Sequence, residues 1–243
     1  MSVLSDLWDD IVRRTPARRL LHLPGRGWVS AREIDAASRD RAAQWADATL
    51  DGRIVLMALA NGPEWLASFI ALSRLGAVPA AADPSTPAAL LPTLAANARA
   101  GWILSGEGLA KAGGVKLRFS GEAPALAKIT SGSTGMPKAL LFRAEEMMAD
   151  GRAIVGAMGI APDDISYGLV PFGHSYGLGN LVMPLLLQGS PIACASSPLP
   201  RLAVADMIES GASVCPGVPA FFRAMNDTEL DATVAEVHAR GAE

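Results

Sequence analysis

The stretch with the clearest chemical potential is residues 129–138, which read Ile-Thr-Ser-Gly-Ser-Thr-Gly-Met-Pro-Lys. Repeated glycine lets consecutive backbone N–H groups converge on an anion, hydroxyl side chains add donors, and Lys138 adds a mobile positive charge. This mixture favours phosphate binding over the alternative, a solvated Ser/Gly turn between two strands. The spacing excludes a Walker loop, because Pro137 stands where its second glycine belongs. The apolar residues 139–142 predict a strand next, so we expect the loop to join two strands, with no helix behind it.

A second candidate site is the loop 171–177, which follows a predicted strand at 163–170. Ligands of open α/β sheets gather at the carboxyl ends of strands, and this loop lies at such an end. His174 is either a hydrogen-bonded loop residue or a residue that faces substrate. Residues 173–177 also read Gly-x-Ser-x-Gly, the nucleophile elbow of α/β-hydrolases, with Ser175 as the nucleophile.

The α/β-hydrolase alternative needs an acid and a histidine downstream of Ser175. The later histidine, His238, lies among apolar residues at helical spacing, whereas a triad histidine normally lies on a loop. The sequence does not rank the candidate acids, which are Asp206, Asp227 and Asp231. This alternative also leaves residues 130–138 without a role.

The loop at 130–138 resembles that of the acyl-adenylate-forming (AMP-binding) superfamily, which includes acyl-CoA synthetases, aryl-CoA ligases, luciferases and nonribosomal adenylation domains. It matches every fixed position of the signature Thr-Ser-Gly-Ser-Thr-Gly-x-Pro-Lys-Gly except the closing glycine, which is replaced by Ala139. In the family this loop holds the β and γ phosphates of ATP. The resemblance implies this role for Thr130, Ser131, Gly132, Ser133, Thr134, Gly135 and Lys138.

Other segments extend the resemblance. Residues 73–84 look like the family's Lys-x-Gly-Ala-x-x-x-Pro-x-x-Pro region, which is usually scaffold, and residues 216–222 resemble a segment whose helix packs beside the acyl pocket. Loop 171–177 is similar to the family's Pro-x-x-His-x-x-Gly segment. This similarity implies that His174 acts with Lys138 in catalysis, near the substrate carboxylate. Phe172, Tyr176 and Gly177 are implied as further residues of the substrate pocket.

Composition excludes several classes of function. An apolar content of 50% and a mean hydropathy of +0.27 over 243 residues indicate a globular protein with a substantial core. The net charge is −3 and no basic run occurs, which argues against a nucleic-acid partner. The two cysteines and three histidines show no metal-ligand spacing, so we expect reduced thiols and no metal ion held by this chain.

The sequence shows neither a secretory signal nor a transmembrane segment. Its N-terminus is acidic, and its longest apolar run, residues 181–187, is far shorter than the roughly 20 residues that cross a bilayer. We therefore expect a cytoplasmic protein.

Helices and strands alternate around the two loops. A continuous apolar run at 53–60, a helix beginning near Pro63 and a strand at 77–80 predict a βαβ unit. A capping box at 30–33 predicts a helix start. Further helices are expected at 4–12, 86–100, 144–158, 180–187 and 202–210, and further strands at 102–104, 115–119, 192–194 and 212–215. The fold class is therefore α/β, with parallel-rich sheets flanked by helices.

The resemblance covers about residues 28–222 and implies the first part of the large N-terminal domain of an AMP-dependent synthetase or ligase. The family's Mg²⁺-binding Glu, its ribose-binding Asp and its small C-terminal domain with a catalytic Lys have no counterpart. We therefore expect residues 1–243 to be a partial N-terminal adenylation domain: a truncation, a frameshifted product or one half of a split pair.

The activity implied for the complete enzyme is ATP-dependent formation of an acyl-AMP, followed by thioester ligation to CoA or to the phosphopantetheine of a carrier protein. ATP, Mg²⁺, a carboxylic acid and a separately encoded C-terminal half are the implied cofactors and partners. The likeness to acyl-CoA synthetases implies fatty acid metabolism, but aliphatic, aryl and amino acids all stay open as substrates. We expect the chain alone to be inactive, and a non-catalytic remnant or scaffold is a further hypothesis.

Overall fold

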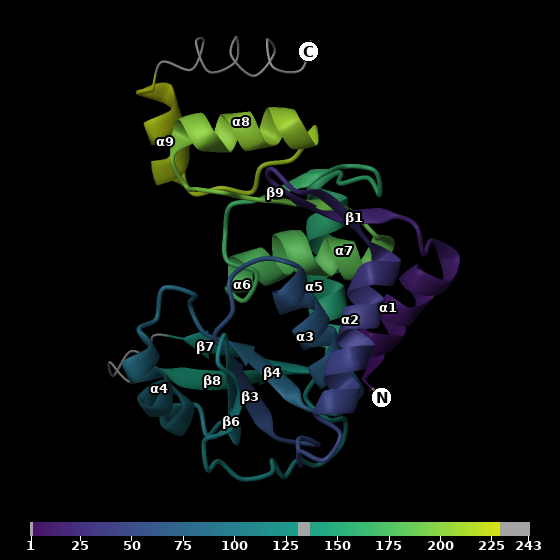
Figure 1. The fold of residues 1–243 in the computed structure, drawn as a ribbon, viewed down its shortest axis with the longest axis vertical. Coiled ribbons are helices and arrows are strands. Elements are labelled where there is room, and N and C mark those ends of the chain that lie inside the picture. The colour runs from purple at the N-terminus through teal and green to yellow at the C-terminus, as the bar shows by residue number, and fades with distance from the viewer. Residues whose placement is uncertain (1, 131–136, 229–243) are drawn as a thin grey trace.

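The computed structural model describes residues 2–130 and 137–228, which form two sheets separated by a layer of helices (Figure 1). The larger sheet has six strands in the order β6-β5-β3-β4-β7-β8, and the smaller has four in the order β2-β1-β10-β9. The predicted fold class, α/β with parallel-rich sheets flanked by helices, is confirmed. The strands of the larger sheet are β3 (Ile54–Met57), β4 (Val78–Ala81), β5 (Trp102–Ser105), β6 (Gly108–Lys111), β7 (Leu126–Thr130) and β8 (Lys138–Phe142).

The six-stranded sheet is parallel in its centre and antiparallel at its edges. β3 pairs in parallel with β4 and β5, and β4 with β7, whereas β6 and β8 fold back on their neighbours. All four residues of β3 are buried because both faces of the sheet are covered. The predicted βαβ unit is confirmed as β3, α3 (Pro63–Arg74) and β4. The predicted strand-to-strand connection is also confirmed, because β7 and β8 pair directly.

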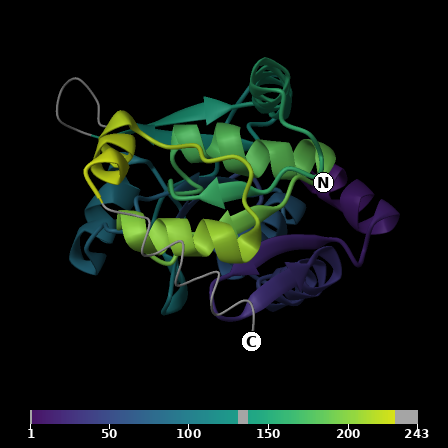
Figure 2. The same ribbon diagram turned by 90° about the horizontal axis from the view of Figure 1, so that it is seen from above.

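The four-stranded sheet consists of β1 (Arg19–Leu23), β2 (Gly27–Ser30), β9 (Ser166–Gly168) and β10 (Ile192–Cys194). β10 lies between β1 and β9 and is parallel to both. Two helices, α8 (Pro200–Ser210) and α9 (Pro219–Asn226), cover one face of this sheet by packing on Tyr167 and Ala193. They lie nearest the viewer in Figure 2.

The helical layer between the sheets carries most of the core. Alternate residues of β3 point to opposite faces, so Val55 and Met57 meet this layer while Ile54 and Leu56 meet α4 on the outer face. The layer contains α1 (Val3–Arg14), α2 (Ala31–Gln44), α3, α5 (Ala144–Met158) and a continuous helical run of α6 (Ser175–Gly177), the π-helical η2 (Leu178–Val182) and α7 (Met183–Gln188). The outer face is covered by η1 (Ala88–Leu90) and α4 (Leu91–Asn97).

Two predicted strands are wrong. Residues 115–119 form no strand, because β5 is paired at this edge by β6, which turns back immediately after Gly106-Glu107. Residues 212–215 make a single bridge, between Val214 and Ser166. The predicted capping box at Ser30 and Glu33 is confirmed at the start of α2. None of the helices in the described residues is long and apolar enough to cross a membrane.

Candidate functional site

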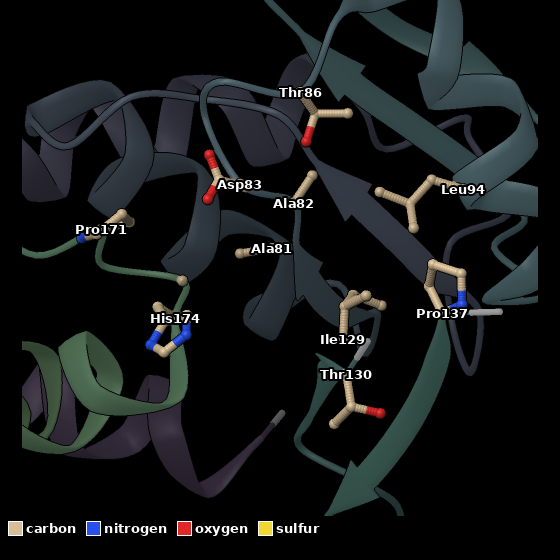
Figure 3. A pocket seen from close by; sticks show the side chains of 11 residues that line it. Ala81, Ala82, Asp83, Thr86, Leu94, Ile129, Thr130, Pro137, Pro171 and His174 are labelled. Carbon is tan, nitrogen blue, oxygen red and sulfur yellow. The ribbon is translucent and has the colours of Figure 1, made fainter. Parts of the chain in front are cut away.

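Both candidate loops open on one cavity, of about 170 Å³, which Figure 3 shows from close by. One wall is the end of β4 and the residues that follow it, Ala81, Ala82 and Asp83. Thr130 and Pro137, which flank the Ser/Gly-rich turn, contribute a second wall, and the loop residues Pro171, Gly173 and His174 a third. The cavity therefore lies at the carboxyl ends of β4 and β7, where ligands of parallel sheets bind.

The turn of the first candidate site is anchored by its two flanking strands. Thr130 and Lys138 are paired across β7 and β8, and the Thr130 hydroxyl donates a hydrogen bond to the Lys138 carbonyl at 3.4 Å. The Lys138 side chain is exposed. The predicted phosphate ligands Ser131, Gly132, Ser133, Thr134 and Gly135 lie outside the described residues, so their role stays a prediction.

His174 caps the first turn of α6 and lines the cavity. Its Nδ1 atom accepts a hydrogen bond from the Tyr176 N–H at 3.3 Å, and the ring is otherwise exposed. Asp83 lines the same cavity as His174 (Figure 3). Hydrogen bonds from the hydroxyl and the N–H of Ser85 lower the pKa of Asp83, and the charge of a protonated His174 lowers it further. A carboxylate and an imidazole therefore face one space.

The Phe172 side chain lies in the core and does not line this cavity, and its predicted place in the substrate pocket stays a prediction. Its ring is fully buried and meets Trp65 edge-on, with ring centroids 5.5 Å apart. The reason is its place in the loop, where the side chain turns toward the helical layer while the backbone passes the cavity. Tyr176 is exposed and donates to the Gly217 carbonyl at 3.4 Å, outside the walls of this cavity. Its role and that of Gly177 stay predictions.

Asn61 fixes the path of the loop, although sequence reasoning did not select it. Its side chain bonds to backbone groups of Gly168, Val170 and Phe172. Close packing fixes the loop again at Gly173, because a Cβ atom there would overlap the Cβ of Ala81. The sequence did contain a signal for Asn61, because it follows a predicted buried strand and precedes Gly62-Pro63.

The Gly-x-Ser-x-Gly spacing is explained by packing rather than by an elbow. A Cβ atom on Gly177 would overlap the Pro171 carbonyl oxygen, just as one on Gly173 would overlap Ala81. An elbow serine has a strained backbone, but among the described non-glycine residues only Arg99 has a positive φ. Asp206 accepts hydrogen bonds from Tyr167 and Ser196. His238 and Asp231 lie outside the described residues.

The model of the AMP-binding enzyme family matches residues 110–241, which include both loops. The chain belongs to this family. In sequence it is 34% identical over 112 residues to the p-hydroxybenzoic acid–AMP ligase FadD22 of Mycobacterium tuberculosis, a match that covers 45% of this chain and 16% of FadD22. It is 27% identical over 184 residues to the 2-succinylbenzoate–CoA ligase of Salmonella typhimurium, which covers 71% of this chain and 40% of that ligase.

The fold of this family member also matches solved structures. Apo MbtA of Mycobacterium smegmatis superposes with a TM-score of 0.78 at 20% identity, over 96% of this chain and 54% of MbtA. The match supports the fold alone. The chain thus spans less than two thirds of the length of each of these three proteins.

Proposed function

We propose that this chain supplies the ATP-phosphate-binding and carboxylate-facing part of an adenylate-forming site. One observation carries the proposal: Thr130 and Pro137, at the two ends of the signature turn, line the same cavity as His174. The triphosphate of an ATP molecule bound by the turn would therefore lie close to a carboxylic acid substrate bound beside His174. Membership of the AMP-binding family supports the same reaction class.

The proposed reaction is attack of a substrate carboxylate oxygen on the α-phosphorus of ATP. A new oxygen–phosphorus bond forms, the bond to the β-phosphate oxygen breaks, and acyl-AMP and pyrophosphate result. Lys138 and the N–H groups of the turn would stabilise the charge on the departing pyrophosphate, and single donors of this kind are worth about 3 to 4 kcal/mol in other enzymes. His174 would orient the attacking carboxylate.

Magnesium enters the proposal with ATP. In residues 2–130 and 137–228, no group of three or more His, Cys, Asp or Glu residues could hold a metal ion. We therefore assign no Mg²⁺ ligand to this part of the chain. The Mg²⁺ ion would neutralise phosphate charge, while Lys138 and the turn would position the phosphates.

We propose an aromatic carboxylic acid as the substrate, in place of the fatty acid implied at first. Two relatives are named for acids of this class, p-hydroxybenzoic acid and 2-succinylbenzoate. The rings of Tyr176 and Phe222 are partly exposed, and both border Gly217 on the His174 side of the molecule. Such rings suit offset stacking against an aryl group.

We further propose that residues 1–243 act as the first part of the large adenylation domain and that this domain works in the cytoplasm. The chain alone is then expected not to catalyse acyl-AMP formation. The proposal also includes transfer of the acyl group to CoA or to a carrier protein. It further includes a separately encoded C-terminal half as a partner of this chain. The partial coverage of the matched relatives supports it. Robust carboxylate-dependent ATP–pyrophosphate exchange by the purified chain would refute the inactivity.

Calorimetric titration of the chain with ATP tests the phosphate site. Lys138→Ala is expected to weaken ATP binding about tenfold or more, because charge-assisted hydrogen bonds contribute about 1.5 to 3 kcal/mol. The matched control is Lys111→Ala, an exposed lysine on β6 at the opposite edge of the same sheet. Equal losses in the two variants would contradict the role of Lys138, and no ATP binding by the unmodified chain would favour the scaffold hypothesis.

A further inference from the structure

The segment that leads to His174 is held by one side chain from the other sheet. Asn61 follows β3 of the six-stranded sheet, whereas Gly168 is the last residue of β9 in the four-stranded sheet. The Asn61 Nδ2 atom donates to the Gly168 carbonyl at 3.2 Å and to the Val170 carbonyl at 2.8 Å. Its Oδ1 atom accepts from the Phe172 N–H at 2.7 Å. Both amide hydrogens and the oxygen are therefore used.

These three bonds reach alternate residues, 168, 170 and 172, and the next alternate residue is His174. Past β9 the segment no longer belongs to a sheet ladder, so its backbone groups need other partners. Two packing contacts reinforce the same path: the Phe172 ring against Trp65, and Gly173 against Ala81. If the segment moves where Asn61 holds it, His174 must therefore move as well. The close contact between Gly173 and Ala81 leaves the backbone no room to absorb the movement.

We propose that Asn61 is a positioning residue of the adenylate site. It sets the place and ring orientation of His174 relative to Thr130 and Pro137, and so couples the sheet that carries the signature turn to the loop that faces the acid. Asn61 acts through the backbone and does not line the cavity. The consequence for ligand binding rests on the proposed function, whereas the consequence for His174 follows from the geometry alone.

The ring of His174 provides a readout that a general loss of stability would not change. Because Nδ1 accepts the Tyr176 N–H, the neutral ring carries its hydrogen on Nε2. Nitrogen NMR of ¹⁵N-histidine-labelled chain distinguishes this tautomer from the mixture of a free imidazole. The signals of His174 are assigned by their loss in His174→Gln.

Two variants and a control separate positioning from stability. Asn61→Ala removes all three bonds and is expected to move the His174 signals to those of a tautomer mixture. Asn61→Asp keeps the acceptor for Phe172 N–H but turns a carboxylate oxygen toward the Gly168 and Val170 carbonyl oxygens, which repel it, so a shift at least as large is expected. The control is Gln188→Ala at the end of α7, which removes amide bonds of similar length, 3.0 Å to the Ile160 carbonyl and 2.8 Å to the Ser190 hydroxyl. It should leave the His174 signals unchanged.

Calorimetric binding of a hydroxybenzoyl-adenosine sulfamate, a stable analogue of an aryl adenylate, completes the test. Asn61→Ala should weaken this binding about tenfold and Gln188→Ala less than twofold. Unchanged His174 signals in the folded Asn61 variants would overturn the inference, and Asn61→Asp decides it if Asn61→Ala does not fold. Altered signals with no analogue binding, even by the unmodified chain, would support the positioning role and refute the proposed function.

Discussion

Charged side chains in the helical layer and at the cavity have opposite surroundings. In the helical layer, the carboxylate of Asp35 accepts hydrogen bonds from Trp8 Nε1 at 3.1 Å, Arg39 Nε at 2.8 Å and Arg74 at 2.6 Å. At the cavity, Asp83, Lys138 and His174 are exposed. The same types of side chain are thus enclosed by partners in one region and left accessible in the other. Enclosed charges stabilise the fold, whereas accessible charges beside a cavity can meet a ligand.

The largest expected effect is the loss of Arg74, whose side chain is only 10% exposed and bonds to Asp9, Asp35 and Ser38. Arg74→Ala removes one of the three donors to the buried Asp35 carboxylate together with the bonds to Asp9 and Ser38, and removing one partner of a buried ion pair destabilises proteins by about 3 to 5 kcal/mol. Urea unfolding measures this change. Arg13→Ala is the control, because Arg13 is 77% exposed and its ion pair with Asp10 contributes at most about 1 kcal/mol. Equal losses in the two variants would contradict the stabilising role of the enclosed charges in the helical layer.

Gly173→Ala tests the close contact between the loop and β4. The added Cβ overlaps that of Ala81, so the loop must move, at an expected loss of about 1 to 3 kcal/mol in the free energy of unfolding. ATP binding should weaken as well, because Gly173 lines the cavity. Gly156→Ala is the matched control: a Cβ there meets open space inside α5, and alanine is expected to stabilise the helix by up to about 1 kcal/mol.

The contribution of Asp35 to acid sensitivity should be a smaller effect. Burial opposes ionisation of Asp35, but hydrogen bonds from Arg39, Arg74 and Trp8 outweigh it and lower its pKa. A lowered pKa in the folded state gives stability that is complete above the unfolded value of about 3.9 and is lost as the pH falls through the folded value. The stability of Asp35→Asn should therefore fall less steeply between about pH 5 and pH 3. If the free energy of unfolding fell equally steeply with pH in Asp35→Asn and in the unmodified chain, the proposed contribution of Asp35 would be contradicted.

The sequence predicted the helical layer better than the edges of the sheets. Apolar runs bounded by Gly and Pro located β3, α3 and β4, because burial on both faces leaves a strong pattern. The prediction failed at 115–119, where the alternation resembles that of a strand but the edge of β5 is paired with β6 instead. Propensity is local, whereas the choice of an edge partner is tertiary.

For the candidate site, sequence reasoning identified the loops but not all of the residues that shape them. The turn and His174 were found because their residue types are unusual for structural loops. Asn61 and Asp83 were missed, since Asn61 acts through contacts with residues more than 100 positions away and Asp83 meets His174 only in the folded cavity. The contacts of Phe172 were not evident from the sequence for the converse reason: its neighbours in sequence line the cavity, but its own ring turns to Trp65.

The smallest expected effect, at the cavity edge, is that of Ser175→Ala. The Ser175 side chain is exposed, and the loop is held by Asn61, Gly173 and Gly177 instead. The free energy of unfolding should therefore change by less than about 0.5 kcal/mol, and ATP affinity should stay within twofold. A nitrophenyl ester assay and labelling with a fluorophosphonate probe provide the contrasting measurement. Ester turnover that disappears in Ser175→Ala would make Ser175 a nucleophile, and accessibility at this edge would then serve a hydrolase rather than an adenylate-forming enzyme.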